Sequence, residues 1–138
     1  MSEVLYTATA TTIGGLEGRV QSDDQVIDFE TALPGSQKSE DSEATNPEQL
    51  FAAAYATCFD SALQIVADKE QLEFQSEVTA KVDLLEDGEG YKLAVHLQVK
   101  GNNIEKSQLE QLVQKANQIW PYAEAKRATM EFTIETQG

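Results

Sequence analysis

The chain has 138 residues and a formal net charge of −14 at pH 7, because 24 acidic residues outnumber 10 basic ones. This length is typical of one domain, which predicts a single domain over residues 1–138. The negative charge excludes nucleic acid and anionic membrane surfaces as partners, since both require clustered Lys and Arg. The chain has one cysteine and therefore no intramolecular disulfide. We expect a reducing, cytoplasmic setting, with no membrane span and no signal peptide.

The first third of the chain alternates with a period of two, which is typical of strands. Residues 4–13 are rich in β-branched side chains and end at a Gly-Gly pair, which is a hairpin signal. Two further strands are expected, through residues 19–21 and over residues 25–32. The polar residues 36–43 have no periodicity and predict a loop.

A long helix is predicted over residues 46–68. Asn46 suits the N-cap, Pro47 suits the first helical position, and Glu48 interacts favourably with the helix dipole. Apolar residues surround this helix almost completely, so we expect it to be buried, and its alanine-rich middle would let another backbone approach closely. Because a monomer of this size would leave part of that surface wet, we predict a homodimer with this helix in its core.

The last part of the chain predicts two strands, a helix and a final strand. The strands are expected over residues 76–85 and 91–100, the helix over residues 105–119, and the final strand over residues 128–135. The full order βββ-α-ββ-α-β within one domain predicts an α+β fold with antiparallel sheet.

Cys58 is the most informative residue for chemistry. A lone cysteine on a buried helix is by default a small core residue, and the alternative is a nucleophilic thiolate. Cys58 lies about 18 Å along the helix from Asn46, at ~1.5 Å per residue. The helix dipole acts only within the first turn, so it cannot lower the pKa of this thiol. Activation of Cys58 therefore requires a cation from another segment.

The remaining polar motifs indicate no site. His96 lies on the polar face of its strand and is interpreted as a solvated surface residue, so no Ser-His-Asp set is expected. The glycines of residues 14–18 precede no helix, which excludes a phosphate-binding loop. No spacing of His, Cys, Asp and Glu matches a metal site, and neither a metal nor a cofactor is expected.

The chain resembles the organic hydroperoxide resistance proteins of the OsmC-like superfamily. The stretch Ala-Thr-Asn-Pro-Glu-Gln-Leu-Phe-Ala-Ala at residues 44–53, followed by Tyr55 and by Ala-Thr-Cys-Phe at residues 56–59, is similar to the central helix of that family. The hairpin residues 14–19 and the segment 121–127 resemble the family too. The likeness therefore covers essentially the whole chain.

This resemblance implies an OsmC-like fold of antiparallel sheets around a buried central helix. It implies an intertwined homodimer with active sites at the subunit interface, a peroxidatic cysteine at Cys58 and a partner glutamate at Glu48. It also implies the reduction of organic hydroperoxides by a dithiol reductant. The pocket residues expected with Cys58 are Leu16, Arg19, Tyr55, Phe59, Trp120, Tyr122 and Arg127.

Two positions depart from the family pattern. The family's resolving cysteine stands directly before Pro-Tyr, where this chain has Trp120, and its activating arginine is replaced by Leu16. Arg19 remains, but three positions along a strand turn its side chain to the opposite face. Without a cation, we expect the pKa of Cys58 to stay at its reference value or to rise with burial. Trp120 ends the apolar stripe of the last helix, so we predict that it packs over Cys58.

Two hypotheses from different classes follow. In the first, the protein is a weakened one-cysteine thiol peroxidase, in which a hydroperoxide oxidises Cys58 to a sulfenic acid and external thiols restore it. In the second, a former peroxidase binds an apolar, acyl-type ligand in a pocket lined by Leu16 and Trp120. A third reading is a core cysteine in a protein with an unrelated role. We favour the peroxidase hypothesis, because the family that the chain resembles consists of hydroperoxide reductases. Whether Lys126 or Arg127 replaces the cation lost at Leu16 is left open by the sequence.

Overall fold

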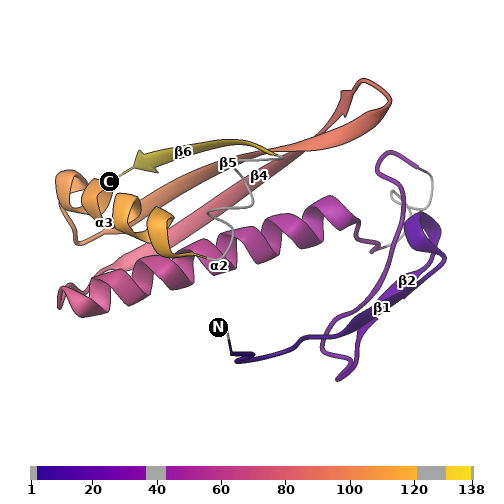
Figure 1. Ribbon diagram of the computed structural model, residues 1–138, viewed down its shortest axis with the longest axis horizontal. Helices are drawn as coiled ribbons and strands as arrows, with labels where there is room; N and C mark the ends of the chain where they lie inside the picture. The colour runs from indigo at the N-terminus through magenta and orange to yellow at the C-terminus, as the bar shows by residue number, and fades with distance from the viewer. Residues whose placement is uncertain (1–2, 37–42, 121–129, 138) are drawn as a thin grey trace. The chain divides into compact units, whose positions relative to one another are not determined.

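A computed structural model describes residues 3–36, 43–120 and 130–137 of the chain. In this part the elements follow the order βββ-α-ββ-α-β, with two α-helices and two three-stranded sheets (Figure 1). The predicted α+β fold class is therefore confirmed. The chain divides into two compact units, residues 1–47 and residues 48–138. The single domain expected from the length stays a prediction.

The first unit contains a short antiparallel sheet. Strand β1 (Ala10–Ile13) pairs with β2 (Arg19–Ser22), which pairs with β3 (Asp28–Glu30). The 3₁₀-helix η1 (Gly15–Glu17) joins β1 to β2. The strand predicted over residues 4–13 is therefore shorter than its pattern suggested, because β2 offers only four residues with which the first strand pairs.

Gly18 explains why the hairpin needs glycine. A Cβ atom at this position would lie 1.7 Å from the carbonyl oxygen of Ile13, so any other residue would collide with the end of β1. Gly14 and Gly15 have positive φ angles of 85° and 56°, which glycine adopts without strain. The Gly-rich stretch is thus a compact turn, in agreement with the hairpin that the sequence predicted.

The first unit buries few of its apolar side chains. Among its described residues only Thr31 and Ala32 are buried. A three-stranded sheet needs at least one covered hydrophobic face for independent stability, so this unit requires a further surface. The large apolar residues that it leaves exposed are Val4, Leu5, Tyr6, Ile13, Leu16, Val26, Ile27, Phe29 and Leu33.

The second unit contains α3 (Lys106–Ile119) and, except for its first residue, α2 (Pro47–Lys69). Its sheet has the order β4-β5-β6. Strand β4 (Gln75–Asp87) pairs antiparallel with β5 (Gly90–Asn102), whereas β6 (Met130–Gln137) pairs parallel with β5. The expectation of purely antiparallel sheet is thus wrong for β6. The physical reason is that the connection through α3 returns the chain to the start of β5 before β6 begins.

The core of the second unit lies between the sheet and its two helices (Figure 1). Val95, Leu97 and Val99 alternate along β5 and are buried on the face that the helices cover. From α3, the apolar stripe at helical spacing points into the same core. The buried residues contributed by the helices are Tyr55, Phe59, Ala62, Leu63, Val66, Ala67, Leu109, Leu112, Val113 and Ala116.

Helix α2 confirms the predicted helix to within one residue at each end. Its expected burial is realised on one side only, since the opposite side, including Ala53, Thr57 and Ser61, is exposed, and Ile65 is 50% exposed. By length and composition α2 is also apolar enough to cross a membrane, contrary to the sequence-based expectation. Core helices of globular proteins pass the same test, and the buried side of α2 packs in the core.

Candidate functional site

Cys58 lies at the start of the fourth turn of α2 with a half-buried side chain that packs against the edge of the core. One helical turn away in either direction lie Ala54, Tyr55, Ser61 and Ala62, none of which is charged. Burial raises the pKa of the Cys58 thiol above its ordinary value, and no charge from the described residues opposes this effect. In this environment the thiol is mostly protonated at neutral pH.

Glu48 and Cys58 are far apart along the same helix. Glu48 stands in the first turn of α2, and ten residues of helix separate it from Cys58 by about 15 Å. A carboxylate at that distance makes no hydrogen bond or ion pair with the thiol. Within one chain, therefore, α2 alone does not bring these two expected site residues together.

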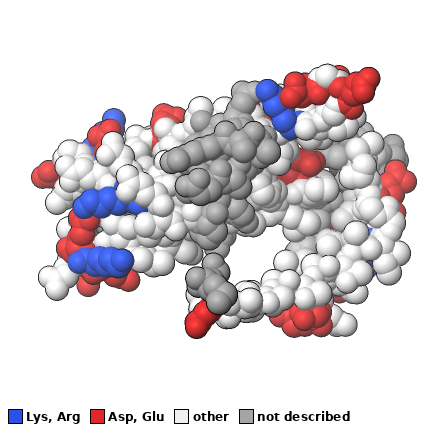
Figure 2. All heavy atoms as spheres, viewed as in Figure 1, with Lys and Arg blue, Asp and Glu red and all other residues white. Residues whose placement is uncertain are grey.

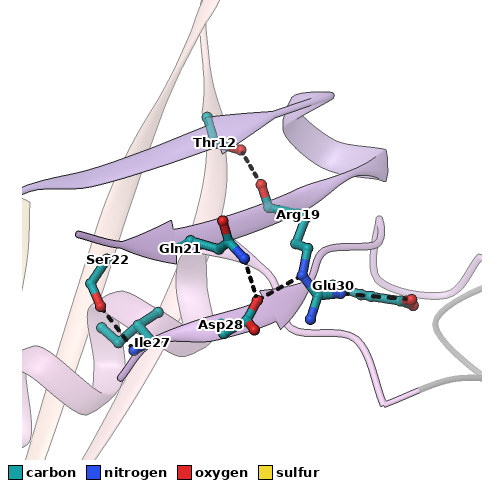
Figure 3. A network of polar contacts seen from close by, with 7 residues as sticks. All are labelled: Thr12, Arg19, Gln21, Ser22, Ile27, Asp28 and Glu30. Atoms are coloured by element: carbon teal, nitrogen blue, oxygen red, sulfur yellow. Dashed lines mark hydrogen bonds and ion pairs between the residues drawn. The ribbon is translucent and has the colours of Figure 1, made fainter. Parts of the chain in front are cut away.

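Arg19 has partners within its own sheet (Figure 3). Its Nε donates a hydrogen bond to Oδ1 of Asp28 at 2.6 Å, and its Nη1 lies 4.0 Å from Oε1 of Glu30. Gln21 Nε2 donates to the same Asp28 oxygen at 2.9 Å. The hydrogen bond with Asp28 raises the pKa of Arg19 and lowers the pKa of Asp28. The one described arginine is thus already engaged by two carboxylates.

Leu16 lies in η1 and is 49% exposed. Its side chain offers neither a charge nor a hydrogen-bond donor to a reacting group. Both Leu16 and Arg19 belong to the first unit, whereas Cys58 belongs to the second. Tyr122, Lys126 and Arg127 lie outside the described residues.

Trp120 is buried against the aromatic side chains of α2. Its indole ring makes edge-to-face contacts with Tyr55, at 4.6 Å between ring centroids, and with Phe59, at 4.9 Å. Indole Nε1 donates a hydrogen bond to Oδ1 of Asn117 at 3.1 Å. The inward position that the apolar stripe of α3 predicted is therefore observed. Tyr55, Phe59 and Trp120 thus lie together in the core, and Cys58 packs against the same cluster. The placement of Trp120 directly over Cys58 stays a prediction.

A family model described as OsmC-like protein matches residues 39–135. This chain belongs to the OsmC-like family. It is 51% identical over 138 residues to organic hydroperoxide resistance protein OhrA of Bacillus subtilis (strain 168), covering 98% of both chains. It is 39% identical over 133 residues to OhrB of the same organism, covering 95% of this chain and 97% of that one. The OsmC-like chain thus belongs to the organic hydroperoxide resistance branch.

Solved structures agree with this assignment. The crystal structure of OhrB of Bacillus subtilis matches with a TM-score of 0.89 at 37% identity, over 97% of this chain and 100% of that chain. An organic hydroperoxide resistance protein from Legionella pneumophila matches with a TM-score of 0.87 at 33% identity, over 99% and 100% of the two chains. The OsmC-like fold therefore extends over nearly the whole chain.

The structure also shows a groove beside α2 that the sequence did not predict. It has a volume of about 490 Å³ and lies between the exposed side of α2 and β4. Ser76 Oγ donates to Asp60 Oδ1 at 2.6 Å and accepts from Gln64 Nε2 at 2.6 Å, so Ser76 links these two polar side chains of the groove. The only sequence signal for this groove is the small set of polar residues within the apolar helix, Thr57, Asp60, Ser61 and Gln64. The groove offers no nucleophile beyond hydroxyl groups.

On the outer sheet face, His96 is half-exposed, as expected. Its Nδ1 lies 2.6 Å from Thr133 Oγ1, and its Nε2 lies 3.4 Å from Asp83 Oδ2. Within the described ranges there is no group of three or more His, Cys, Asp or Glu side chains that would hold a metal ion. The side chain with the strongest nucleophilic chemistry in the described part of this OsmC-like chain is therefore Cys58.

Proposed function

We propose that this OsmC-like protein takes part in peroxide detoxification as a one-cysteine organic hydroperoxide reductase, with Cys58 as the catalytic residue. The observation that carries this proposal is the place of the chain's single cysteine. Cys58 lies half-buried beside an aromatic cluster on the central helix of a chain 51% identical to OhrA. The names of the relatives support peroxide detoxification as the general role.

In the first step, the Cys58 thiolate attacks the terminal oxygen of the hydroperoxide. The O–O bond breaks, the alcohol leaves after taking up a proton, and Cys58 becomes a sulfenic acid. Only the thiolate reacts, and burial raises the pKa of Cys58. The thiolate fraction at pH 7 is therefore at most a few per cent, and it rises about tenfold for each unit of pH below the pKa.

In the second step, external thiols must restore Cys58, because the chain has no other cysteine. A thiolate attacks the sulfenic sulfur, water leaves, and a mixed disulfide forms. A second thiolate then attacks the sulfur that the first external thiol contributed to the mixed disulfide, and Cys58 is released as a thiolate. Trp120, which occupies the position that the family resemblance gives to the resolving cysteine, fills its site with a buried ring and offers no thiol.

A homodimer is part of the proposal. The exposed apolar side chains of the first unit need a surface to cover them, and the exposed side of α2 is rich in small residues. The separation of about 15 Å between Glu48 and Cys58 along α2 also means that a site using both needs a bridging group from another segment. A second copy of the chain is the natural source of such a surface and such a group.

Binding of an apolar, acyl-type ligand without chemistry is the second candidate function. It is favoured by the buried aromatic contacts of Trp120 and by the absence of a charge on Leu16. Neither replacement supplies a charge or a thiol for catalysis, whereas the exposed side chain of Leu16 would give an apolar ligand contact area.

One experiment separates the two functions. The purified protein is treated with cumene hydroperoxide, and a sulfenic acid at Cys58 is trapped with dimedone and measured by mass spectrometry. We expect near-stoichiometric labelling of Cys58, faster at pH 9 than at pH 7, and thiol-dependent consumption of peroxide that is lost in Cys58→Ser. Tight binding of a fatty acid by a chain whose Cys58 is never oxidised would instead establish the binding function.

A further inference from the structure

We propose that the thiol regenerating Cys58 is uncharged or cationic, and that the field of the protein disfavours anionic thiols. This inference rests on the proposed one-cysteine function, because only an enzyme without a resolving cysteine depends on direct attack by an external thiol. It names the charge of the external thiol that a site with one cysteine requires, whereas the family resemblance implies only a dithiol reductant.

The first argument is the long-range field. The formal net charge is −14, with 24 acidic and 10 basic residues. Two of the basic side chains are also paired with carboxylates, Arg19 with Asp28 and Lys115 with Glu70. Figure 2 accordingly shows more acidic than basic side chains on the face that it displays. A field of this sign repels an approaching anion and lowers its encounter rate.

The second argument is the local environment of Cys58. Its neighbours one turn away are uncharged, and its side chain packs at the edge of the core with Phe51 and Tyr55. Only burial contributes to the raised pKa of Cys58, so no described cation lies close enough to act on it. A sulfonate or carboxylate on the reductant would lose hydration here without gaining a partner from the described residues. The local environment of Cys58 and the long-range field of the protein therefore both disfavour an anionic thiol.

The charge of the reductant affects the rate of the step that regenerates Cys58. The attacking species is a thiolate, so an aminothiol attacks as a neutral zwitterion, a hydroxythiol with charge −1, and a sulfonated thiol with charge −2. The thiolate forms an S–S bond to Cys58, the S–O bond of the sulfenic acid breaks, and hydroxide leaves as water after protonation. A second thiolate completes the reduction, and the product is the reductant's own disulfide.

Three thiols of matched two-carbon length test the proposal: cysteamine, 2-mercaptoethanol and 2-mercaptoethanesulfonate. Cys58 is first oxidised with cumene hydroperoxide, and the decay of its sulfenic acid is followed at equal concentrations of each thiolate. At about 10 mM ionic strength we expect cysteamine to be fastest and the sulfonate slowest, with roughly tenfold or more between them. At about 0.5 M salt, screening should reduce this ratio to a few-fold. The same thiols reacting with a small uncharged disulfide correct for intrinsic nucleophilicity.

Two charge variants sharpen the test. Asp60→Asn keeps an acceptor for Ser76 and removes a negative charge two residues from Cys58, so the sulfonate rate should rise about twofold at low salt. Glu86→Gln removes the same charge from the end of β4 and should change the rate less.

Equal corrected rates for the three thiols, or a faster sulfonate, would overturn the charge selection while leaving the peroxidase proposal intact. Absence of a trapped sulfenic acid, or its persistence with all three thiols, would instead refute the proposed function itself. The two failures are therefore distinguishable in one series of measurements.

Discussion

The two units of the chain treat their apolar side chains in opposite ways. The second unit buries its apolar stripes between a sheet and two helices, whereas the first unit buries only Thr31 and Ala32 among its described residues. Because burial of apolar surface is the main favourable term in folding, the second unit carries most of the stability of the chain. The first unit leaves most of its large apolar side chains exposed. It supplies apolar surface without a core of its own.

The largest expected effect comes from one substitution made in both units. Phe59→Ala in the second unit removes a fully buried ring and should cost about 3–5 kcal/mol of the free energy of unfolding. Phe29→Ala in the first unit removes a ring that is 44% exposed in the single chain and should cost about 1 kcal/mol or less. Urea denaturation measures both. A Phe29→Ala loss as large as that of Phe59→Ala would show that a second copy buries Phe29.

The next largest effect is expected from Leu16→Arg, which returns a cation to the first unit. In Leu16→Arg, a guanidinium that reaches Cys58 should lower the pKa of this thiol by at least about one unit, which is a tenfold gain in thiolate at pH 7. The rate of alkylation by iodoacetamide against pH gives this pKa. Leu33→Arg, at a site of equal exposure in the same unit, is the matched control and should leave the pKa unchanged.

Trp120→Cys tests the other departure from the family pattern. This substitution should add an intramolecular disulfide with Cys58 after peroxide treatment, detectable by non-reducing mass spectrometry, and should allow turnover with a dithiol. The increase in peroxide turnover from Trp120→Cys and the increase from Leu16→Arg should reinforce each other, because the two substitutions act on successive steps of the reaction. Loss of the buried indole should also cost a few kcal/mol of stability, so Trp120→Phe serves as the packing control.

A smaller effect concerns the pH dependence of stability. Because burial raises the pKa of Cys58 in the folded chain, the folded state favours the neutral thiol. This contribution is fully present below the unfolded pKa of about 8.5 and is lost as pH rises through the folded pKa. The unfolding free energy of the unmodified protein should therefore fall more between pH 8 and pH 10 than that of Cys58→Ser. Parallel curves for the two proteins would contradict burial as the cause.

The smallest effect is expected for the ion pair of the first unit. Asp28→Asn removes the main partner of Arg19, and because both side chains are well exposed and screened by solvent, the loss of stability should be small. The pKa of Asp28 is lowered, so the contribution of this pair is present above about pH 4 and is lost as pH falls through the folded pKa. Urea melts should show a smaller difference between the two proteins at pH 3 than at pH 7.

Local sequence signals determined the elements of this protein. The Asn-Pro-Glu start of α2, the alternation along β5 and the apolar stripe of α3 each depend on neighbouring residues, and each predicted element is present. The stripe also predicted the inward position of Trp120, because a large apolar residue at helical spacing follows the face of its helix.

Only the tertiary structure decided which distant groups meet. It gave β6 a parallel partner, left one side of α2 exposed, engaged Arg19 with Asp28, and placed Trp120 against Tyr55 and Phe59. None of these follows from local pattern, because strand direction and side-chain partners depend on contacts between segments far apart in the chain. The sequence by itself determined that Cys58 is the single thiol on an apolar helix. The packing around it determined that burial, without a described cation, raises its pKa.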